Sequence, residues 1–312
     1  MKFVHIADMH FDSPFTGLSN TGNLGDIRRL EQRKVFKKVI DYIKQNKIEY
    51  LFIAGDLYEH EYIRKSSIEY INRLFQEIEN TKIFISPGNH DPYIKGSYYE
   101  EFPWSKNVQI CKNQWEIVED ENIDIYMTAF TNFYENQPII EQIQIKNPNK
   151  INILLTHCDL NGKQDENGFS YQPILESKLN AMGFDYVAMG HIHKTNFAPH
   201  KKVVYPGSMI SFGFDETGEH GMVVGELSGK NLTTNFIKLD DRLFTKCELT
   251  VDNFSSKEDL LEKINNLKWD TMNLYEVILM GNRQFDINPR EILNLIEQEN
   301  ILKIKDNTRN CL

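Results

Sequence analysis

The sequence predicts an α/β fold with two sheets, and three observations support this prediction. Short apolar runs alternate with amphipathic helical segments over residues 3–86, which is the order expected of a parallel sheet. Each apolar run ends in polar side chains. Between Trp104 and Thr128 the runs become short and are separated by acidic turns, which indicates meander strands in a second sheet.

The composition limits the class of protein. At 312 residues the chain is long enough for one large domain and one small one. Apolar residues make up 40% and charged residues 26%, and no stretch approaches the ~20 apolar residues of a membrane span. The N-terminus carries no export signal, and the four cysteines form no C-x-x-C motif. We therefore expect a soluble, cytoplasmic protein with no membrane partner.

The net charge of −10 argues against a protein that coats nucleic acid by bulk electrostatics. It leaves room for a local basic groove. Any role in nucleic-acid chemistry must therefore depend on a specific site.

The first part of the chain is predicted to alternate strands and helices, at residues 3–7, 27–47, 50–54, 66–79 and 82–86. The three strands lead to Asp8 and His10, to Asp56, and to Asn89 and His90. Because the carboxyl ends of parallel strands meet at one edge, we expect these side chains to share it.

Two later strands also end in histidines. The run 151–155 leads to His157, and the run 186–189 leads to His191 and His193. Further strands near 222–225 and 233–238 complete a domain that spans residues 1–240.

The remaining residues, 241–312, predict a small separate α+β domain. Its expected elements alternate between strand and helix, at residues 244–251, 256–267, 275–280, 289–298 and 301–305.

The polar strand ends together make a candidate metal-ligand set: Asp8, His10, Asp56, Asn89, His157, His191 and His193. Carboxylates with several imidazoles suit Mn²⁺, Fe²⁺ or Zn²⁺ better than Mg²⁺ or Ca²⁺. Seven ligands exceed the needs of one ion, whereas two ions ~3.5–4 Å apart that share a carboxylate accommodate them. Each motif alone is more often local hydrogen bonding; five in this order favour a metal centre.

This arrangement resembles the calcineurin-like metallophosphoesterase family, whose motifs are D-x-H, G-D, G-N-H-[DE], a strand-end His and G-H-x-H. They occur here at residues 8–10, 55–56, 88–91, 157 and 190–193. The resemblance implies a two-sheet sandwich flanked by helices, with Asp56 bridging two ions. It implies Asp8, His10 and His193 on the first ion and Asn89, His157 and His191 on the second, with Mn²⁺ expected and Fe²⁺ or Zn²⁺ as alternatives.

Finer features resemble the SbcD-type bacterial DNA-repair exonucleases and their YhaO-like relatives. These features include the stretches 7–15, 55–58, 205–208 and 213–216 and the trailing unit, which is similar to a capping domain. Some members of this group place a histidine three residues after the bridging aspartate, where this chain has Glu59. The relatives often continue into a segment that docks on an SMC-like ATPase, whereas this chain ends soon after the small unit.

The implied reaction is in-line attack of a hydroxide, activated by two metals, on a phosphodiester phosphorus. The sequence makes His90 and Asp91 the candidate catalytic residues. His90 would protonate the leaving oxygen or bind the phosphate, and Asp91 would orient His90 or shape the turn.

The first functional hypothesis is a DNA exonuclease or endonuclease, with DNA as partner and an SMC-like ATPase or a second copy of the chain as further candidate partners. The alternative is a phosphodiesterase or phosphomonoesterase acting on small nucleotides or other phosphoesters. A non-catalytic scaffold is a third reading, but such a protein would have no need of seven metal ligands.

Overall fold

The computed structural model describes residues 1–18, 21–162 and 167–311. Its contacts divide the chain into two compact units. Among the described residues, unit 1 comprises 1–18, 22–162, 167–210 and 220–240, and unit 2 comprises Thr21, residues 211–219 and the chain from Asp241 onward. The segment 211–219, which the sequence left within the large domain, therefore groups with unit 2.

The first sheet of unit 1 contains six strands in the order β11-β10-β1-β2-β3-β4. Four strands run parallel, namely β1 (Lys2–Ile6), β2 (Tyr50–Ile53), β3 (Lys82–Ile85) and β4 (Val108–Ile110). β10 (Gly221–Ser228) and β11 (Asn231–Lys238) continue the sheet in antiparallel fashion. The helices α1 (Leu24–Asn46) and α2 (Lys65–Gln76) connect successive parallel strands, as their helical spacing predicted.

The second sheet contains five strands in the order β5-β6-β7-β8-β9. Its strands are β5 (Trp115–Glu119), β6 (Ile123–Thr128), β7 (Ile151–His157), β8 (Tyr186–Gly190) and β9 (Val203–Val204). Only β5 and β6 form an antiparallel hairpin, around the predicted acidic turn; the other neighbours are parallel.

The predicted second sheet is thus confirmed, but one of its expected strands is not part of it. β4 pairs in parallel with β3 in the first sheet, so placing all of residues 104–128 in the second sheet was wrong. A strand of three residues is too short for the alternation of its apolar and polar side chains to indicate which sheet it joins.

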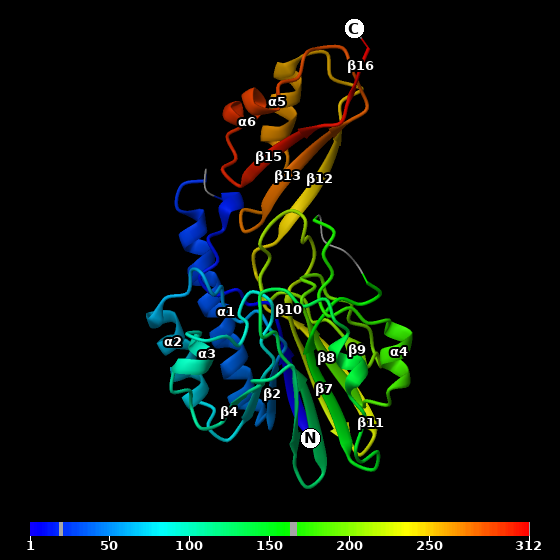
Figure 1. The fold of residues 1–312 in the computed structure, drawn as a ribbon. Coiled ribbons are helices and arrows are strands. Elements are labelled where there is room, and N and C mark those ends of the chain that lie inside the picture. The colour runs from blue at the N-terminus through cyan, green and yellow to red at the C-terminus, as the bar shows by residue number, and fades with distance from the viewer. Residues whose placement is uncertain (19–20, 163–166, 312) are drawn as a thin grey trace. The chain divides into compact units, whose positions relative to one another are not determined.

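The two sheets pack face to face through a hydrophobic core. Alternate residues of the first sheet, including Phe3, Phe52 and Phe84, meet residues of β6, β7 and β8 there. The buried His5 also joins the two sheets, since its Nδ1 accepts a hydrogen bond from the hydroxyl of Tyr186 in β8 at 2.8 Å. The helices α1, α2 and α3 (Tyr98–Glu101) lie beside the first sheet and α4 (Glu176–Ala181) beside the second (Figure 1). Unit 1 is therefore a sandwich flanked by helices, as expected.

Unit 2 contains a three-stranded parallel sheet in the order β12-β13-β15 and a two-stranded ladder, β14-β16. Its elements are β12 (Phe244–Thr250), α5 (Lys257–Asn266), β13 (Leu274–Met280), β14 (Asn282–Arg283), α6 (Pro289–Leu295), β15 (Ile301–Asp306) and β16 (Arg309–Asn310). Both helices begin at side-chain caps: Ser256 accepts from the Asp259 N–H, and Asn288 accepts from the N–H groups of Arg290 and Glu291. The predicted order of strands and helices is confirmed.

Candidate metal centre

The carboxyl ends of strands from both sheets of unit 1 meet at one edge, and all seven predicted ligands lie there. In the first sheet, the backbone N–H of Asp8 donates to Gly55 O at 3.1 Å, and that of His10 donates to Asp56 O at 2.9 Å. These bonds hold the ends of β1 and β2 together beyond the strands themselves.

Four of the predicted ligands adopt backbone conformations with positive φ: Asp8 (52°), His10 (47°), Asp56 (52°) and His191 (104°). Residues with a Cβ atom rarely adopt this region, and such strain is concentrated at functional sites. Hydrogen bonds stabilise it: the N–H of His191 donates to both carboxylate oxygens of Asp8 at 3.1 Å, and the N–H of His90 donates to Asp56 Oδ1 at 2.9 Å.

One cluster of potential ligand atoms is formed by Asp8, His10 and His193, which lie within 4.8 Å of one another. The Nε2 atoms of His10 and His193 face each other at 3.0 Å. Asp8 Oδ1 lies 4.0 Å from the first of these nitrogens and 3.9 Å from the second. Two imidazoles and a carboxylate thus converge on one point.

A second cluster lies next to it. His157 Nε2 lies 3.0 Å from Asn89 Oδ1 and 3.2 Å from Asp56 Oδ2. His191 Nδ1 approaches Asn89 Oδ1 at 3.3 Å. Asp56 Oδ2 is also 3.6 Å from His10 Nε2, so this carboxylate lies between the two clusters, where a bridging ligand is expected.

The outward nitrogens of three histidines face hydrogen-bond acceptors. His10 Nδ1 donates to Glu59 Oε1 at 2.6 Å, His157 Nδ1 to Ala54 O at 2.9 Å and His191 Nε2 to Asp159 Oδ1 at 3.1 Å. In neutral rings, these bonds leave a lone pair on each inward nitrogen, which is the orientation that metal-binding histidines adopt.

His157 Nε2 lies within about one hydrogen-bond length of both Asp56 Oδ2 and Asn89 Oδ1, in a nearly solvent-free position. Burial lowers the pKa of His157, but the charge of Asp56 and its hydrogen bond raise it to about 9, so a positive charge on the ring balances these acceptors. A divalent cation would replace that proton and supply the positive charge that the buried oxygens need. The residues present thus fit two divalent ions. That each of the seven residues binds an ion is a prediction.

Two glycines allow the strand ends to approach this closely. A Cβ atom on Gly190 would lie 1.7 Å from Ala54 O, and one on Gly88 would lie 2.2 Å from Asp56 Oδ1. Gly88 precedes Asn89, so any larger residue there would displace either Asp56 or the turn that carries Asn89.

His90 lies at the rim of the centre, with 47% of its side chain exposed. Its Nδ1 donates to Glu59 Oε2 at 3.0 Å, so Glu59 joins it to His10. Partial burial lowers the pKa of His90, but the charges of Asp56 and Glu59 outweigh this effect and raise it to about 10. Burial raises the pKa of Glu59, but hydrogen bonds from both histidines lower it to about 2. The pair is therefore an imidazolium and a carboxylate.

Asp91 is completely buried, and its carboxylate accepts four hydrogen bonds. Oδ1 accepts from the N–H groups of Asp56 (2.9 Å) and Gly88 (2.7 Å), and Oδ2 accepts from Leu57 N–H (2.7 Å) and the Tyr99 hydroxyl (2.5 Å). Burial and the charge of Asp56 raise the pKa of Asp91 to about 7, while the bonds from Tyr99 and Gly88 lower it. The carboxylate thus joins the turn after β2 to the turn after β3, and supports the turn-shaping alternative.

Sequence reasoning gave no role to Glu59 or Asp159. Each follows a predicted ligand closely, Asp56 by three residues and His157 by two, and Glu59 also occupies the position where some members of the resembling group place a histidine. The Asp159 carboxylate is held in turn by the Tyr171 N–H at 2.6 Å. Only the fold shows that these two acids orient histidines that come from other strands.

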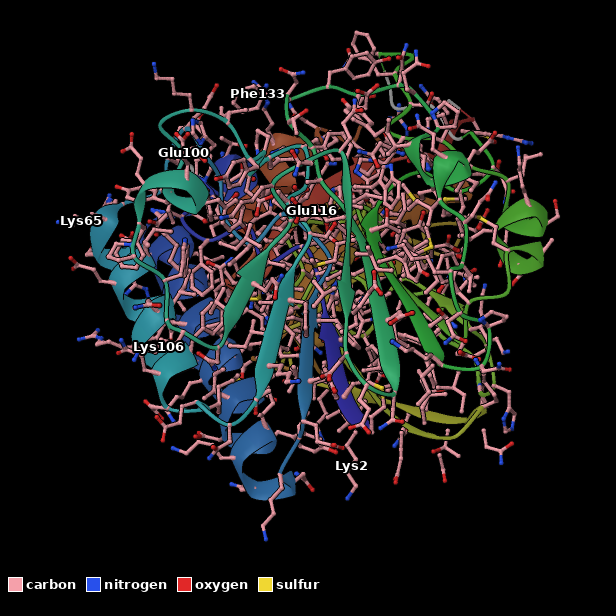
Figure 2. All side chains as sticks on the ribbon, turned by 60° about the horizontal axis from the view of Figure 1, so that its bottom comes forward. Lys2, Lys65, Glu100, Lys106, Glu116 and Phe133 are labelled. Carbon is pink, nitrogen blue, oxygen red and sulfur yellow. The ribbon has the colours of Figure 1, made fainter. Side chains whose placement is uncertain are left out.

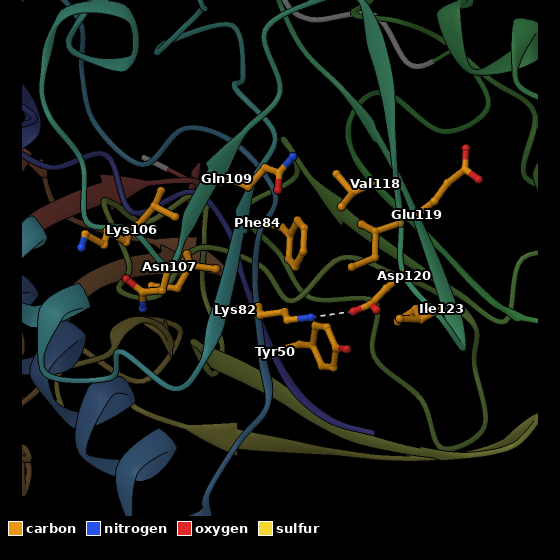
Figure 3. Close-up of a pocket in the computed structure, with 13 residues that line it drawn as sticks. Tyr50, Lys82, Phe84, Lys106, Asn107, Gln109, Val118, Glu119, Asp120 and Ile123 are labelled. Atoms are coloured by element: carbon orange, nitrogen blue, oxygen red, sulfur yellow. Dashed lines mark hydrogen bonds and ion pairs between the residues drawn. The ribbon is translucent and has the colours of Figure 1, made fainter.

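A separate cavity of about 400 Å³ lies at the opposite ends of the strands (Figure 3). It is lined by the first residues of β2 and β3, Tyr50 and Lys82, and by Asp120 from the β5–β6 turn. Lys82 Nζ and the Asp120 carboxylate pair at 2.5 Å within it. This cavity shares no residue with the metal centre.

Among the helices that the structure describes, none combines the length and the apolar character needed to cross a membrane.

Comparison with known proteins provides a context for this centre. Residues 1–195 match the family model described as calcineurin-like phosphoesterase. The chain is 24% identical to the metallophosphoesterase YhaO of Bacillus subtilis over 85% of this chain and 67% of that protein. It is 23% identical to the SbcD subunit of the nuclease SbcCD from Staphylococcus saprophyticus over 77% of this chain and 69% of that one. A solved structure of the phosphoesterase Yfce from E. coli aligns with 74% of this chain and 96% of its own, at 14% identity and a TM-score of 0.33.

Proposed function

The chain belongs to the calcineurin-like phosphoesterase family, and from this premise we propose that it is a metal-dependent phosphodiesterase that hydrolyses DNA. The observation that carries the proposal is the convergence of all seven predicted ligands at one edge of unit 1. The choice of DNA draws on similarity to a protein named as part of the nuclease SbcCD.

The ligand set supports a site for two divalent ions. Asp8, His10 and His193 would hold one ion; Asn89, His157 and His191 would hold the other; and Asp56 would touch both. The chemistry that such bound ions supply to phosphoester hydrolysis is neutralisation of the phosphoryl oxygens and activation of the attacking water. The mixture of imidazole and carboxylate ligands favours Mn²⁺, with Fe²⁺ or Zn²⁺ as alternatives.

His90 would supply the proton for the leaving oxygen. Its Nδ1 is committed to Glu59, so Nε2 is the ring atom that can reach a substrate at the exposed rim. The T-shaped contact with His10, at a centroid distance of 4.9 Å, keeps this ring beside the predicted first ion. Glu59 thus orients both the candidate acid and a candidate ligand.

A substrate panel tests the proposal. The purified chain with added Mn²⁺ would be assayed on single-stranded DNA, duplex DNA, a chromogenic phosphodiester and a phosphomonoester. We expect DNA hydrolysis that is lost on chelation, and a drop of about 100-fold or more in His90→Ala, whose metal content by elemental analysis stays at the wild-type level. No hydrolysis of either form of DNA would refute the assignment.

The net charge of −10 favours the alternative substrate class, small nucleotides or other phosphoesters. The same panel separates the two classes. Turnover of the monoester or of mononucleotides far above that of DNA would support the small-substrate enzyme.

A partner subunit is a further part of the proposal. The staphylococcal relative is named as one subunit of a nuclease. The candidate partners of this chain are an SMC-like ATPase and a second copy of the chain, and binding of either is a prediction. Chromatography of the chain alone at several concentrations would test for the homodimer.

A further inference from the structure

Exposed aromatic side chains gather beside the metal centre. Among the described residues, four large aromatic residues are 40% or more exposed to solvent: Tyr62 (52%), Phe133 (48%), Tyr134 (40%) and Phe169 (46%). Tyr62 follows Glu59 by three residues, and the other three belong to the segments around Phe130 and Tyr171. Single exposed apolar residues need no explanation, whereas a group of them beside a site marks a binding surface.

A row of ring contacts runs from the centre to the surface. The Tyr171 ring lies 4.9 Å from that of His191, a predicted ligand. The Tyr134 ring lies 5.5 Å from Tyr171 and 5.0 Å from Phe169. The exposed rings of Tyr134 and Phe169 are therefore two and three ring contacts from His191.

Phe133, the neighbour of Tyr134, extends toward the other side of the centre. Its ring lies 5.5 Å from the ring of His60. The backbone N–H of His60 donates to the backbone carbonyl of His90 at 3.0 Å. Figure 2 shows Phe133 at the end of unit 1 opposite Lys2, the first residue of β1, which is the end where the strands deliver the ligands. Two adjacent aromatic residues thus reach toward both halves of the centre.

Backbone bonds fix the segment that carries these rings. The Phe130 N–H donates to Pro87 O at 3.0 Å, just before the turn that holds Asn89, and the Phe130 carbonyl accepts from Tyr93 N–H at 2.8 Å. At the other end, Gln172 N–H donates to Glu135 O at 2.7 Å. The surface is therefore held in place before any substrate binds, which lowers the entropy cost of binding.

We propose that Phe133, Tyr134 and Phe169 form a stacking surface for the nucleobases of single-stranded DNA, beside the phosphodiester at the metal centre. The proposal rests on the proposed function and names the substrate form. Aromatic faces stack on any base, whereas the bases of a duplex are already stacked on each other. Stacking also provides affinity that a chain of net charge −10 cannot obtain from bulk electrostatics.

The test compares strands with and without bases. Fluorescence anisotropy would measure the binding of two labelled single-stranded oligonucleotides of equal length, one normal and one with abasic sites, both with phosphorothioate linkages to slow hydrolysis. The full chain with Mn²⁺ would be used, as wild type and as the double variant Phe133→Leu with Tyr134→Leu.

We expect the wild type to bind the normal strand at least 5-fold more tightly than the abasic strand, since one stacked base contributes roughly 5-fold to 150-fold in affinity. The double variant should lose this preference and leave abasic affinity unchanged. Tyr134→Phe should keep it, and Leu30→Ala, which changes a 60% exposed residue on α1, should resemble wild type.

Equal affinity of the wild type for the two strands would overturn the proposal. A double variant that binds both strands more weakly by the same factor would also overturn it. Hydrolysis of unmodified versions of the strands distinguishes this failure from failure of the proposed function. Cleavage of normal and abasic DNA at the same kcat/KM would refute the stacking surface alone, whereas cleavage of neither would refute the nuclease assignment.

Discussion

Replacement of Asp91 by Asn tests whether this residue shapes the centre or acts on His90. The four donors that its carboxylate accepts come from the backbone of both turns and from Tyr99, whereas the His90 ring faces Glu59. We therefore expect Asp91→Asn to loosen the two turns together and to lower both stability and metal retention.

The expected magnitude follows from the four bonds. Asn presents one oxygen and one NH₂ group. If the NH₂ takes the place of Oδ2, it faces the Leu57 N–H but can donate to the Tyr99 oxygen; if it takes the place of Oδ1, it faces the N–H groups of Asp56 and Gly88. At least one buried N–H loses its acceptor, at about 1–3 kcal/mol, and the other bonds lose a charged acceptor. The neutral Asn also relieves the burial and the repulsion from Asp56 that raise the pKa of Asp91, which offsets part of this cost. The free energy of unfolding should therefore fall by about 1–2 kcal/mol.

Urea unfolding followed by circular dichroism would measure this change at pH 8, where the Asp91 carboxylate is ionised, with and without Mn²⁺. Metal content would be measured on the same samples. The control is Asp286→Asn, because the Asp286 side chain is 93% exposed and the same substitution there should change stability by less than about 0.5 kcal/mol. An Asp91→Asn protein with wild-type stability and metal content would refute the reasoning, and a shifted pH profile of hydrolysis in that protein would assign Asp91 to His90 instead.

Three further predictions concern other parts of unit 1. Glu59→Gln should weaken Mn²⁺ binding by about 10-fold to 100-fold in calorimetric titration, because His10 loses a charged acceptor on Nδ1. Asp240→Asn should lower the free energy of unfolding by about 1–3 kcal/mol in urea, because the fully buried Arg28 guanidinium loses the charge and one of the two acceptors of its bidentate partner, now at 2.8 and 3.2 Å, while it keeps Glu31 at 2.6 Å. Burial lowers the pKa of His5 to about 3 from an unfolded value near 6.5, so stability should fall by about 1.4 kcal/mol per pH unit below pH 6.5, up to about 5 kcal/mol.

Each of these predictions has its own control. Unchanged Mn²⁺ affinity in Glu59→Gln would show that His10 does not need this acceptor. For Asp240→Asn, the matched control is Asp26→Asn, which removes an exposed pair with Arg29 and should cost less than about 1 kcal/mol; equal losses would contradict the importance of burial. For His5, the pH slope should flatten in His5→Gln, and an unaltered slope would assign the acid sensitivity to other groups.

The order of strands and helices could be read from the sequence because it follows from local periodicity. The runs that became β1, β2 and β3 are apolar and short, and the segments between them repeat apolar residues at helical spacing. The candidate ligands could be named for a related reason: each lies directly after a strand, and parallel strand ends must share an edge.

Tertiary structure decided what depends on contacts between distant segments. It placed β4 beside β3, because pairing partners are not encoded in a three-residue run. It turned Glu59 toward His10 and His90 and Asp159 toward His191, contacts that no spacing along the chain could indicate. The sequence by itself therefore determined the chemistry available at this edge, through residue types at strand ends. Only the fold determined how those groups are oriented, because orientation comes from hydrogen bonds between strands far apart in the chain.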